Sequence, residues 1–103
     1  MYGPKPLGHW SSHQAPNASK EHDFLTAGKR YRVIQQFTDF DKDPHPVGEQ
    51  WTFLGCSFLP YEDGMSFFVS LDGTDEWHIR LQWRPEEQGE ILDHLAAYIG
   101  PMA

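Results

Sequence analysis

The segment from Trp77 to Trp83 alternates strictly between apolar and polar side chains. Its apolar members are Trp77, Ile79, Leu81 and Trp83, and the polar residues between them are His78, Arg80 and Gln82. Because successive side chains of a β-strand point to opposite faces of a sheet, this period of two predicts a strand with one buried face. The chain is therefore expected to fold around a β-sheet.

Three earlier segments show a similar alternation and predict further strands. They span residues 31–37, 51–56 and 65–71. The connections at 60–64 and 72–74 contain Gly together with Pro or Asp, and they are short enough for β-hairpins. Consecutive strands joined by hairpins lie antiparallel and adjacent, so the sequence predicts an antiparallel meander.

The end of the chain predicts one α-helix over residues 85–99. Pro85 suits the first helical position, two acidic residues follow it in the first turn, and Gly100-Pro101 ends the helix. The apolar residues in between repeat at one-, three- and four-residue steps, which is typical of a helix with one apolar stripe. The fold class is therefore mainly β, bordering on α+β.

Two architectures bury the faces of these strands. One is a small SH3-like barrel, and the other is a curled antiparallel meander of four to five strands, each with the C-terminal helix. Gly55 lies in the middle of a predicted strand, where a small barrel needs a bend, and this favours the barrel.

Residues 1–23 differ in composition from the rest of the chain. They are rich in Pro, Gly, Ser, Asn, Gln and His, and they hold few large apolar side chains. Such a segment cannot bury enough surface to offset its ordering entropy. We therefore expect a disordered polar tail, followed by a single β-barrel-like domain at 24–103.

Acidic residues outnumber basic ones. Eight Lys and Arg against fifteen Asp and Glu give a net charge of −7 with neutral His. This charge argues against binding to nucleic acid, which needs a basic face, and against docking on an anionic membrane. Cys56 is the only cysteine, so no intrachain disulfide forms, and no apolar run approaches the ~18 residues that span a bilayer. We expect a cytoplasmic protein.

The acidic residues concentrate in two predicted loops. A meander places the connections at 38–50 and 72–76 at one end of the sheet, where their carboxylates would form an acidic rim. The rim comprises Asp39, Asp41, Asp43, Glu49, Asp72, Asp75 and Glu76. It is either a solvated face that keeps the protein soluble or a docking surface for a cationic partner.

Phe58 and Tyr61 form a second candidate surface, in the connection between two predicted strands. They either cover the mouth of the barrel as part of a hairpin held by Pro60 and Gly64, or form an exposed aromatic patch. Mixed aromatic and polar surfaces of this kind bind peptides.

No motif for catalysis or metal binding is complete. The run Asp39–Asp43 has the alternating acids of a calcium-binding loop, but Pro44 replaces the required Gly and Gln50 replaces the required Glu. The six histidines share no ligand spacing. Cys56 lies in an apolar stretch, which is more typical of a buried structural thiol than of a nucleophile. We therefore expect no catalytic residue, metal or cofactor, and a protein that is not an enzyme.

Several short motifs are spread over the predicted domain. They are Gly28-Lys29-Arg30-Tyr31-Arg32-Val33, Phe37-Thr38-Asp39, Gly48-Glu49-Gln50-Trp51-Thr52-Phe53-Leu54-Gly55, Tyr61-Glu62-Asp63-Gly64 and Ile79-Arg80-Leu81-Gln82. Together they resemble, over residues 25–99, a small bacterial family catalogued only as a domain of unknown function. The resemblance implies a bacterial origin and supplies no catalytic residue or ligand. The turn that begins at Gly48 and enters an aromatic strand also resembles SH3-like barrels.

These observations predict a non-enzymatic module that binds another protein through the acidic rim or the Phe58 and Tyr61 surface. A small acidic protein fits an adaptor or an immunity-type protein that neutralises a basic toxin, because complementary charge gives fast capture. The alternative is a small-molecule or cation-binding domain that uses the barrel mouth.

Overall fold

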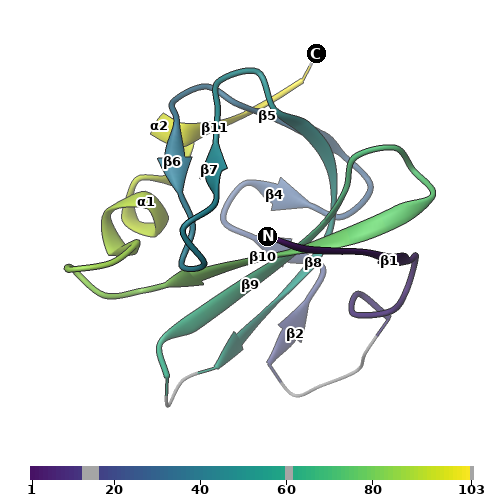
Figure 1. Cartoon of the computed structure of the whole chain (residues 1–103), viewed down its shortest axis with the longest axis horizontal. Helices are drawn as coiled ribbons and strands as arrows, with labels where there is room; N and C mark the ends of the chain where they lie inside the picture. Colours follow the sequence, from purple (N-terminus) through teal and green to yellow (C-terminus); the bar gives the residue numbers. More distant parts are fainter. Residues whose placement is uncertain (13–16, 60–61, 103) are drawn as a thin grey trace.

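The computed structural model describes residues 1–12, 17–59 and 62–102. In this part of the chain, seven strands form one antiparallel sheet (Figure 1). The strands are β1 (Tyr2–Pro6), β2 (Ala18–Ser19), β5 (Arg30–Val33), β8 (Gln50–Leu59), β9 (Gly64–Ser70), β10 (Asp75–Gln82) and β11 (Ile99–Pro101). They follow the order β1-β10-β9-β8-β5-β11, and β2 pairs with β8 beside this path.

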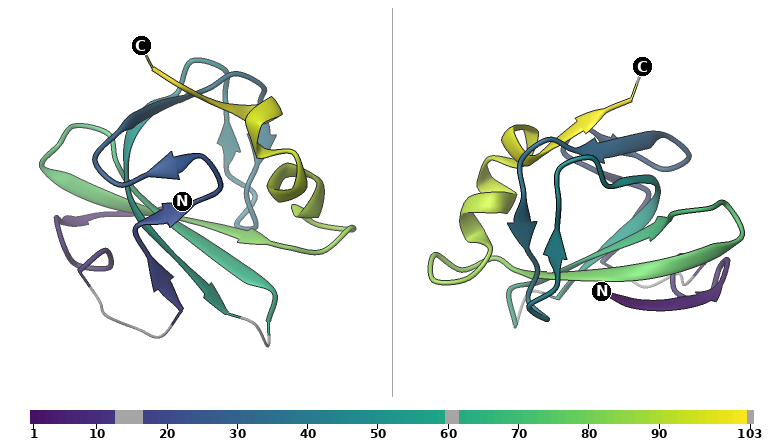
Figure 2. Two further views of the ribbon diagram at one scale, coloured as in Figure 1. Left: turned by 180° about the vertical axis from the view of Figure 1, so that it is seen from behind. Right: turned by 45° about the horizontal axis from the view of Figure 1, so that its top comes forward.

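Two short hairpins lie outside the main sheet. The first pairs β3 (Glu21–His22) with β4 (Leu25–Thr26), and the second pairs β6 (Phe37–Thr38) with β7 (Pro44–His45). The β6–β7 hairpin lies beside the C-terminal helices in every view (Figure 2), and the rings of Phe37 and Tyr98 meet edge to face at 6.3 Å.

The centre of the sheet is the meander that the alternating patterns predict. β8, β9 and β10 are consecutive in the chain and adjacent in the sheet, and the register pairs Trp77 with Val69. Along β10 the side chains of Ile79 and Leu81 are buried, whereas Arg80 is half-buried on the other face. The period of two therefore identified the strand and, at Ile79 and Leu81, its core face, whereas Trp83 follows the end of β10 and is exposed.

The sheet is curled but open, so the expected closed barrel is wrong. Its two outer strands, β1 and β11, do not pair with each other. Both strands contain proline, Pro4 and Pro6 in β1 and Pro101 in β11. Because proline has no N–H group with which to extend a ladder, it suits strands at the edge of a sheet. The chain adopts the alternative architecture, a curled antiparallel sheet (Figure 2).

Gly55 marks a bulge in the middle of β8. The register with β9 shifts between Phe53 and Gly55. A Cβ atom at position 55 would lie 3.1 Å from the carbonyl oxygen of Ser19, in β2. The glycine therefore lets β2 approach the bulge closely, and the bend predicted at this residue serves an open sheet rather than a barrel.

The C-terminal helix is shorter than predicted and is divided in two. α1 spans Gly89–Asp93 and α2 spans Leu95–Tyr98, in place of one helix over 85–99. The preceding turn is fixed by Gln88, whose side chain accepts a hydrogen bond from the backbone N–H of Gln82 (3.0 Å). At the other end Ile99 pairs with Val33 and is fully buried in β11. Pairing with β5 thus overrides the helical pattern at Ile99.

The N-terminal segment is part of the fold, in contrast to the disordered tail expected at 1–23. β1 pairs with β10, with Lys5 opposite Glu76, and the short strands β2 and β3 follow. Residues 13–16 lie outside the described residues. Composition misled here because the segment is held mainly through its backbone, which a count of apolar side chains does not register.

Glu76 is the residue that holds this segment. Its side chain is 0% exposed, and its carboxylate accepts hydrogen bonds from the backbone N–H groups of Gly8 (2.5 Å), Trp10 (2.9 Å) and Ser11 (2.9 Å) and from the Ser11 hydroxyl (2.8 Å). Burial raises the pKa of Glu76, but these hydrogen bonds outweigh it and lower the pKa below the ordinary 4.5. The carboxylate is therefore charged and fully bonded inside the protein.

The core lies between the inner face of the sheet and the two helices. Its largest fully buried side chains are Trp51, Tyr31, Phe53, Phe67, Leu25, Ile79, Leu81, Leu95 and Ile99. Aromatic residues contribute much of this buried surface, which helps a short chain to reach stability. Among the described residues, no helix is long and apolar enough to cross a membrane.

Replacing Glu76 with Gln tests how strongly the N-terminal segment is held. The amide keeps one acceptor oxygen but turns an NH2 group toward backbone donors, so we expect the free energy of unfolding to fall by about 2–3 kcal/mol. Urea denaturation measures the loss, and hydrogen exchange should quicken at residues 8–11. Glu86→Gln, at an exposed turn, is the matched control and should change stability by less than about 0.5 kcal/mol. Equal stability of the two variants would contradict this role for Glu76.

Candidate functional site

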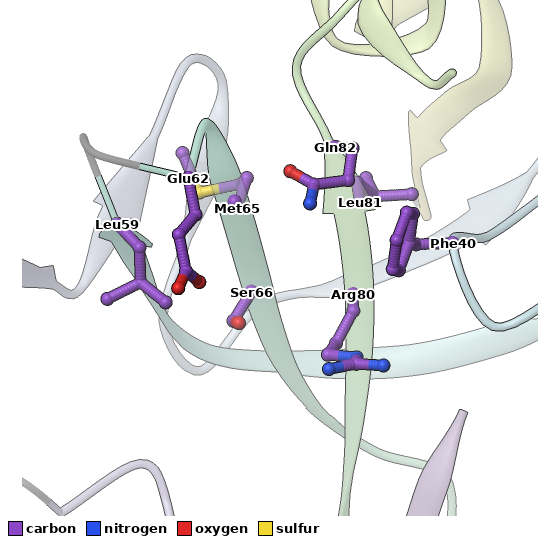
Figure 3. A pocket seen from close by; sticks show the side chains of 9 residues that line it. Phe40, Leu59, Glu62, Met65, Ser66, Arg80, Leu81 and Gln82 are labelled. Atoms are coloured by element: carbon purple, nitrogen blue, oxygen red, sulfur yellow. The ribbon is translucent and has the colours of Figure 1, made fainter.

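A groove opens on the outward face of β9 and β10, opposite the core (Figure 3). Ser66 lies opposite Arg80 in the register, and Gly64 lies opposite Gln82. Alternation along the two strands brings these residues to one face, because their neighbours Phe67 and Ile79 point into the core. The groove has a volume of about 60 Å³.

The lining of the groove combines apolar and polar side chains. The apolar ones are Phe40, Leu59, Met65 and Leu81, and the polar ones are Glu62, Ser66, Arg80 and Gln82. Phe40 comes from the turn between β6 and β7, and Leu59 and Glu62 come from the connection of β8 with β9. Segments distant in the sequence therefore meet at this place.

Arg80 binds the turn between β6 and β7 to the sheet. Its Nε and Nη2 atoms donate to the Asp41 carboxylate at 3.1 and 2.5 Å, and the hydroxyl of Tyr2 donates to the same carboxylate at 2.9 Å. The hydrogen bonds from Arg80 are the main reason why the pKa of Asp41 is lowered. The guanidinium carbon also lies 5.0 Å from the ring centre of Tyr2 and 5.5 Å from that of Phe40. The charge of Arg80 is thus neutralised within the protein.

Ser66 and His78 form the second polar contact on this face. Ser66 Oγ lies 2.7 Å from His78 Nε2, and the rings of Trp10, Tyr2 and Phe68 pack around the imidazole. Burial lowers the pKa of His78 to about 4, and the charge of Arg80 adds to this effect. His78 is therefore neutral at neutral pH, and its hydrogen bond fixes the position of the Ser66 hydroxyl.

Of the expected acidic rim, the carboxylates of Asp39 and Glu76 are fully buried, and that of Glu49 is half-buried. Asp39 is 0% exposed, and its oxygens lie 2.8 Å from Nε2 of His45 and 3.1 Å from the Met1 ammonium. Glu49 lies 2.6 Å from the other ring nitrogen of His45 and accepts a hydrogen bond from the Trp51 indole at 3.2 Å. Together with the buried Glu76, these residues stabilise loops and do not form a surface.

The remaining acids of the rim do not gather at one end. Asp41 is bonded to Arg80, and Asp43 is exposed beside the Met1 ammonium. Asp72 is exposed in the connection between β9 and β10, where it accepts from the backbone of Thr74 and Asp75. Asp75 is half-buried at the start of β10.

The two acidic loops lie at different places along β10. The backbone N–H of Phe40 donates to the carbonyl of Arg80, so the turn between β6 and β7 lies near the end of β10, whereas the connection between β9 and β10 lies at its beginning (Figure 1). The deduction of a single acidic rim is therefore wrong. The deduction assumed that each loop lies at the end of the sheet where its flanking strands end, but the β6–β7 hairpin folds back across the sheet.

Phe58, one of the two residues of the expected aromatic patch, is not exposed in the structure. Phe58 is half-buried and packs against the core, with its ring 6.0 Å from that of Trp83 in an edge-to-face contact. Tyr61 lies outside the described residues. The nearby exposed apolar side chains are Leu59, at the groove, and Trp83, whose indole donates to Asp93 at 2.8 Å.

Asp39 and Cys56, considered for metal binding and for nucleophilic chemistry, are buried within the fold. Within residues 1–12, 17–59 and 62–102, no group of three or more His, Cys, Asp or Glu side chains is arranged to hold a metal ion. In the acidic run, Asp39 accepts hydrogen bonds from the backbone N–H groups of Asp41 and Asp43. Cys56 is buried, and desolvation raises the pKa of its thiol.

The groove was not predicted from the sequence. The alternating pattern places Arg80 and Gln82 on the polar face of a strand, but a local pattern gives no register that would bring Ser66 opposite Arg80. The expected placement of the 38–50 connection at the end of the sheet shared with 72–76 also gave no reason for its residues to lie over the face of β10 near Arg80. The short hairpin of β9 with β10 was the one signal that could have located the Ser66 and Arg80 pair.

His45 should make the stability of the fold depend on pH. Burial lowers its pKa, but hydrogen bonds to Glu49 and Asp39 and the charges of these carboxylates outweigh burial, so the pKa is raised above the ordinary 6.5. The stabilisation is then complete below pH 6.5 and is lost as the pH rises through the raised pKa. Urea denaturation of the wild type should therefore show a falling free energy of unfolding over this range.

A matched pair of variants assigns this pH dependence. His45→Gln should remove the decline, whereas His94→Gln, at an exposed position, should keep it. Titration of the imidazole resonances by NMR gives an independent measurement. A His45 ring that loses its proton below pH 6.5 would contradict the role of the two carboxylates.

Comparison with known proteins places the chain in a family without an assigned role. A model of the family described as domain of unknown function DUF3601 matches residues 10–102, which includes much of the expected tail. The chain is similar to the structure of an integron cassette protein from the mobile metagenome of Vibrio cholerae, with 38% identity and a TM-score of 0.77 over 81% of this chain and 91% of that one. No curated protein matches. Because the family model covers most of the sequence, the chain belongs to the DUF3601 family of domains of unknown function.

Proposed function

We propose that this protein is a non-enzymatic module that binds another protein, and that the groove between β9, β10 and the β6–β7 turn is the centre of its contact surface. The observation that carries the proposal is the open groove itself, which combines the exposed Leu59 and the half-buried Phe40 with polar side chains, beside the buried Met65 and Leu81. Leu59, at its rim, is 49% exposed. Binding sites in proteins typically combine an apolar lining with a few polar groups that fix the orientation of the bound group.

The size of the groove favours a protein partner over a small molecule. Its volume of about 60 Å³ is far below the roughly 300–1,000 Å³ of pockets that enclose cofactors and drug-sized ligands. A groove of this size has room for the end of one side chain while the rest of the partner lies on the surrounding surface. The alternative of a small-molecule domain therefore has less support.

We propose no catalytic role for Ser66 and His78, although they stand at hydrogen-bond distance at the groove. A general base works best with a pKa near the working pH, and the pKa of His78 is about 4. Among the described residues, no carboxylate hydrogen bonds to the second ring nitrogen of His78, as it would in a triad. The pair is better suited to fix the hydroxyl for binding.

The net charge of −7 supports a basic partner. Acidic surface residues raise the rate of encounter with a cationic protein even when they do not touch it. The similarity to an integron cassette protein supports a bacterial origin, and the single cysteine supports a cytoplasmic location. An adaptor or immunity-type protein fits these properties.

A groove-filling substitution tests the proposal. A Cβ at Gly64 would meet its nearest neighbours, Leu59 and Gln82, at 3.8 and 3.9 Å, which is ordinary contact, so Gly64→Trp should fold and block the groove. Thr74→Trp, in an exposed loop, is the matched control. A partner captured from source cells at low salt should bind the Gly64→Trp variant at least about tenfold more weakly than the wild type and the control.

Calorimetry with the purified partner measures the three affinities, and circular dichroism verifies that each variant is folded. Equal affinity of the wild type and a folded Gly64→Trp variant would overturn the groove as the contact surface.

A further inference from the structure

Glu62 is the acidic residue of the groove. Its side chain is exposed, and its carboxylate extends into the space between Leu59 and Ser66 (Figure 3). Among the described residues, no cationic group forms an ion pair with this carboxylate. Of the two arginines nearby, Arg80 pairs with Asp41, and Arg84 pairs with Asp63 at 3.3 Å and donates to the backbone carbonyl of Glu62 (3.4 Å) rather than to its carboxylate.

The groove also presents two uncharged acceptors. The amide of Gln82 is best oriented with its nitrogen donating to the backbone carbonyls of Asp63 (3.1 Å) and Glu62 (2.6 Å). This orientation places the amide oxygen where Figure 3 draws the nitrogen, on the side of Arg80 and Ser66. The Ser66 oxygen keeps a lone pair whichever way its bond to His78 is directed.

An acceptor-rich groove with one uncompensated negative charge calls for a cation with several donors. A guanidinium group is planar and carries five N–H donors, whereas the ammonium group of lysine is a compact and more strongly hydrated charge. The apolar side chains of Leu59 and Met65 stand beside the acceptors and suit an aliphatic stem. The volume of about 60 Å³ matches a head group rather than a whole ligand.

We infer that the groove binds the side chain of an arginine on the partner protein, with Glu62 pairing with the guanidinium and Gln82 and Ser66 accepting its remaining donors. This inference rests on the proposed function, because it names the partner chemistry of the same groove. The charge of the whole chain agrees with it, since a protein with a net charge of −7 attracts basic partners.

NMR titration with single amino-acid analogues tests the inference without a known partner. The probes are N-acetyl-arginine amide, its neutral isostere N-acetyl-citrulline amide, and N-acetyl-lysine amide. We expect the arginine probe to shift amide resonances of residues 64–66 and 80–82 with a millimolar dissociation constant. The lysine probe should bind more weakly, and the citrulline probe should cause no saturable shift.

Two variants assign the binding to the carboxylate. Glu62→Gln should weaken the arginine probe about threefold or more, as expected for an exposed ion pair. Glu86→Gln removes the same charge at an exposed position outside the groove lining and should leave the affinity unchanged. The inference is overturned if the arginine probe does not bind, or if it binds no better than the citrulline probe. It is also overturned if the shifts are confined to other acidic loops, or if Glu62→Gln keeps full affinity for the arginine probe.

The two proposals fail in different ways. If the arginine probe does not bind but Gly64→Trp still loses the partner, the arginine inference is wrong and the interaction surface stands. If the arginine probe binds at Glu62 but Gly64→Trp keeps full affinity for the partner, the groove is not the contact surface of that complex and the proposed function is wrong.

Discussion

The buried carboxylate of Asp39 organises the part of the molecule on which the groove depends. Its oxygens accept from the backbone of Asp41 and Asp43 and contact the ring of His45. These contacts fold the turn between β6 and β7 so that Phe40 and Asp41 lie over β10. Removing a charged acceptor from such a buried position costs about 3–5 kcal/mol. The position of Phe40 and Asp41 at the groove therefore depends on a carboxylate that is itself buried and inaccessible at the surface.

Buried carboxylates also change how the charge of this protein is understood. The sequence carries fifteen acidic residues, but Asp39 and Glu76 are fully buried, and Glu49 faces His45. Each is compensated by backbone N–H groups, an imidazole or the Met1 ammonium. A carboxylate that is bonded in this way gives rigidity to a loop, whereas an exposed one contributes to the field outside the protein. Glu62 belongs to the second kind, and this makes it the more informative residue for binding.

Local sequence patterns predicted the central strands well. They predicted poorly which distant segments of the chain contact one another. The alternation along β10 and the Gly-containing hairpins were sufficient to predict the meander of β8, β9 and β10. The open edge was missed because nothing in a local pattern says whether the first and last strands pair. The N-terminal segment was missed because one distant residue, Glu76, holds it through backbone hydrogen bonds. The groove needed the register of Ser66 with Arg80 and the folding back of Phe40, both of which arise only in three dimensions.

The prolines at the two edges of the sheet have a consequence for the protein at high concentration. An open sheet exposes unpaired backbone groups that can template the addition of a strand from another molecule, which is a common start of aggregation. Pro4 and Pro6 in β1, and Pro101 in β11, each remove a donor from such a template. These prolines thus weaken edge-to-edge pairing between molecules, which a closed barrel would abolish, and the outer face of the sheet stays accessible.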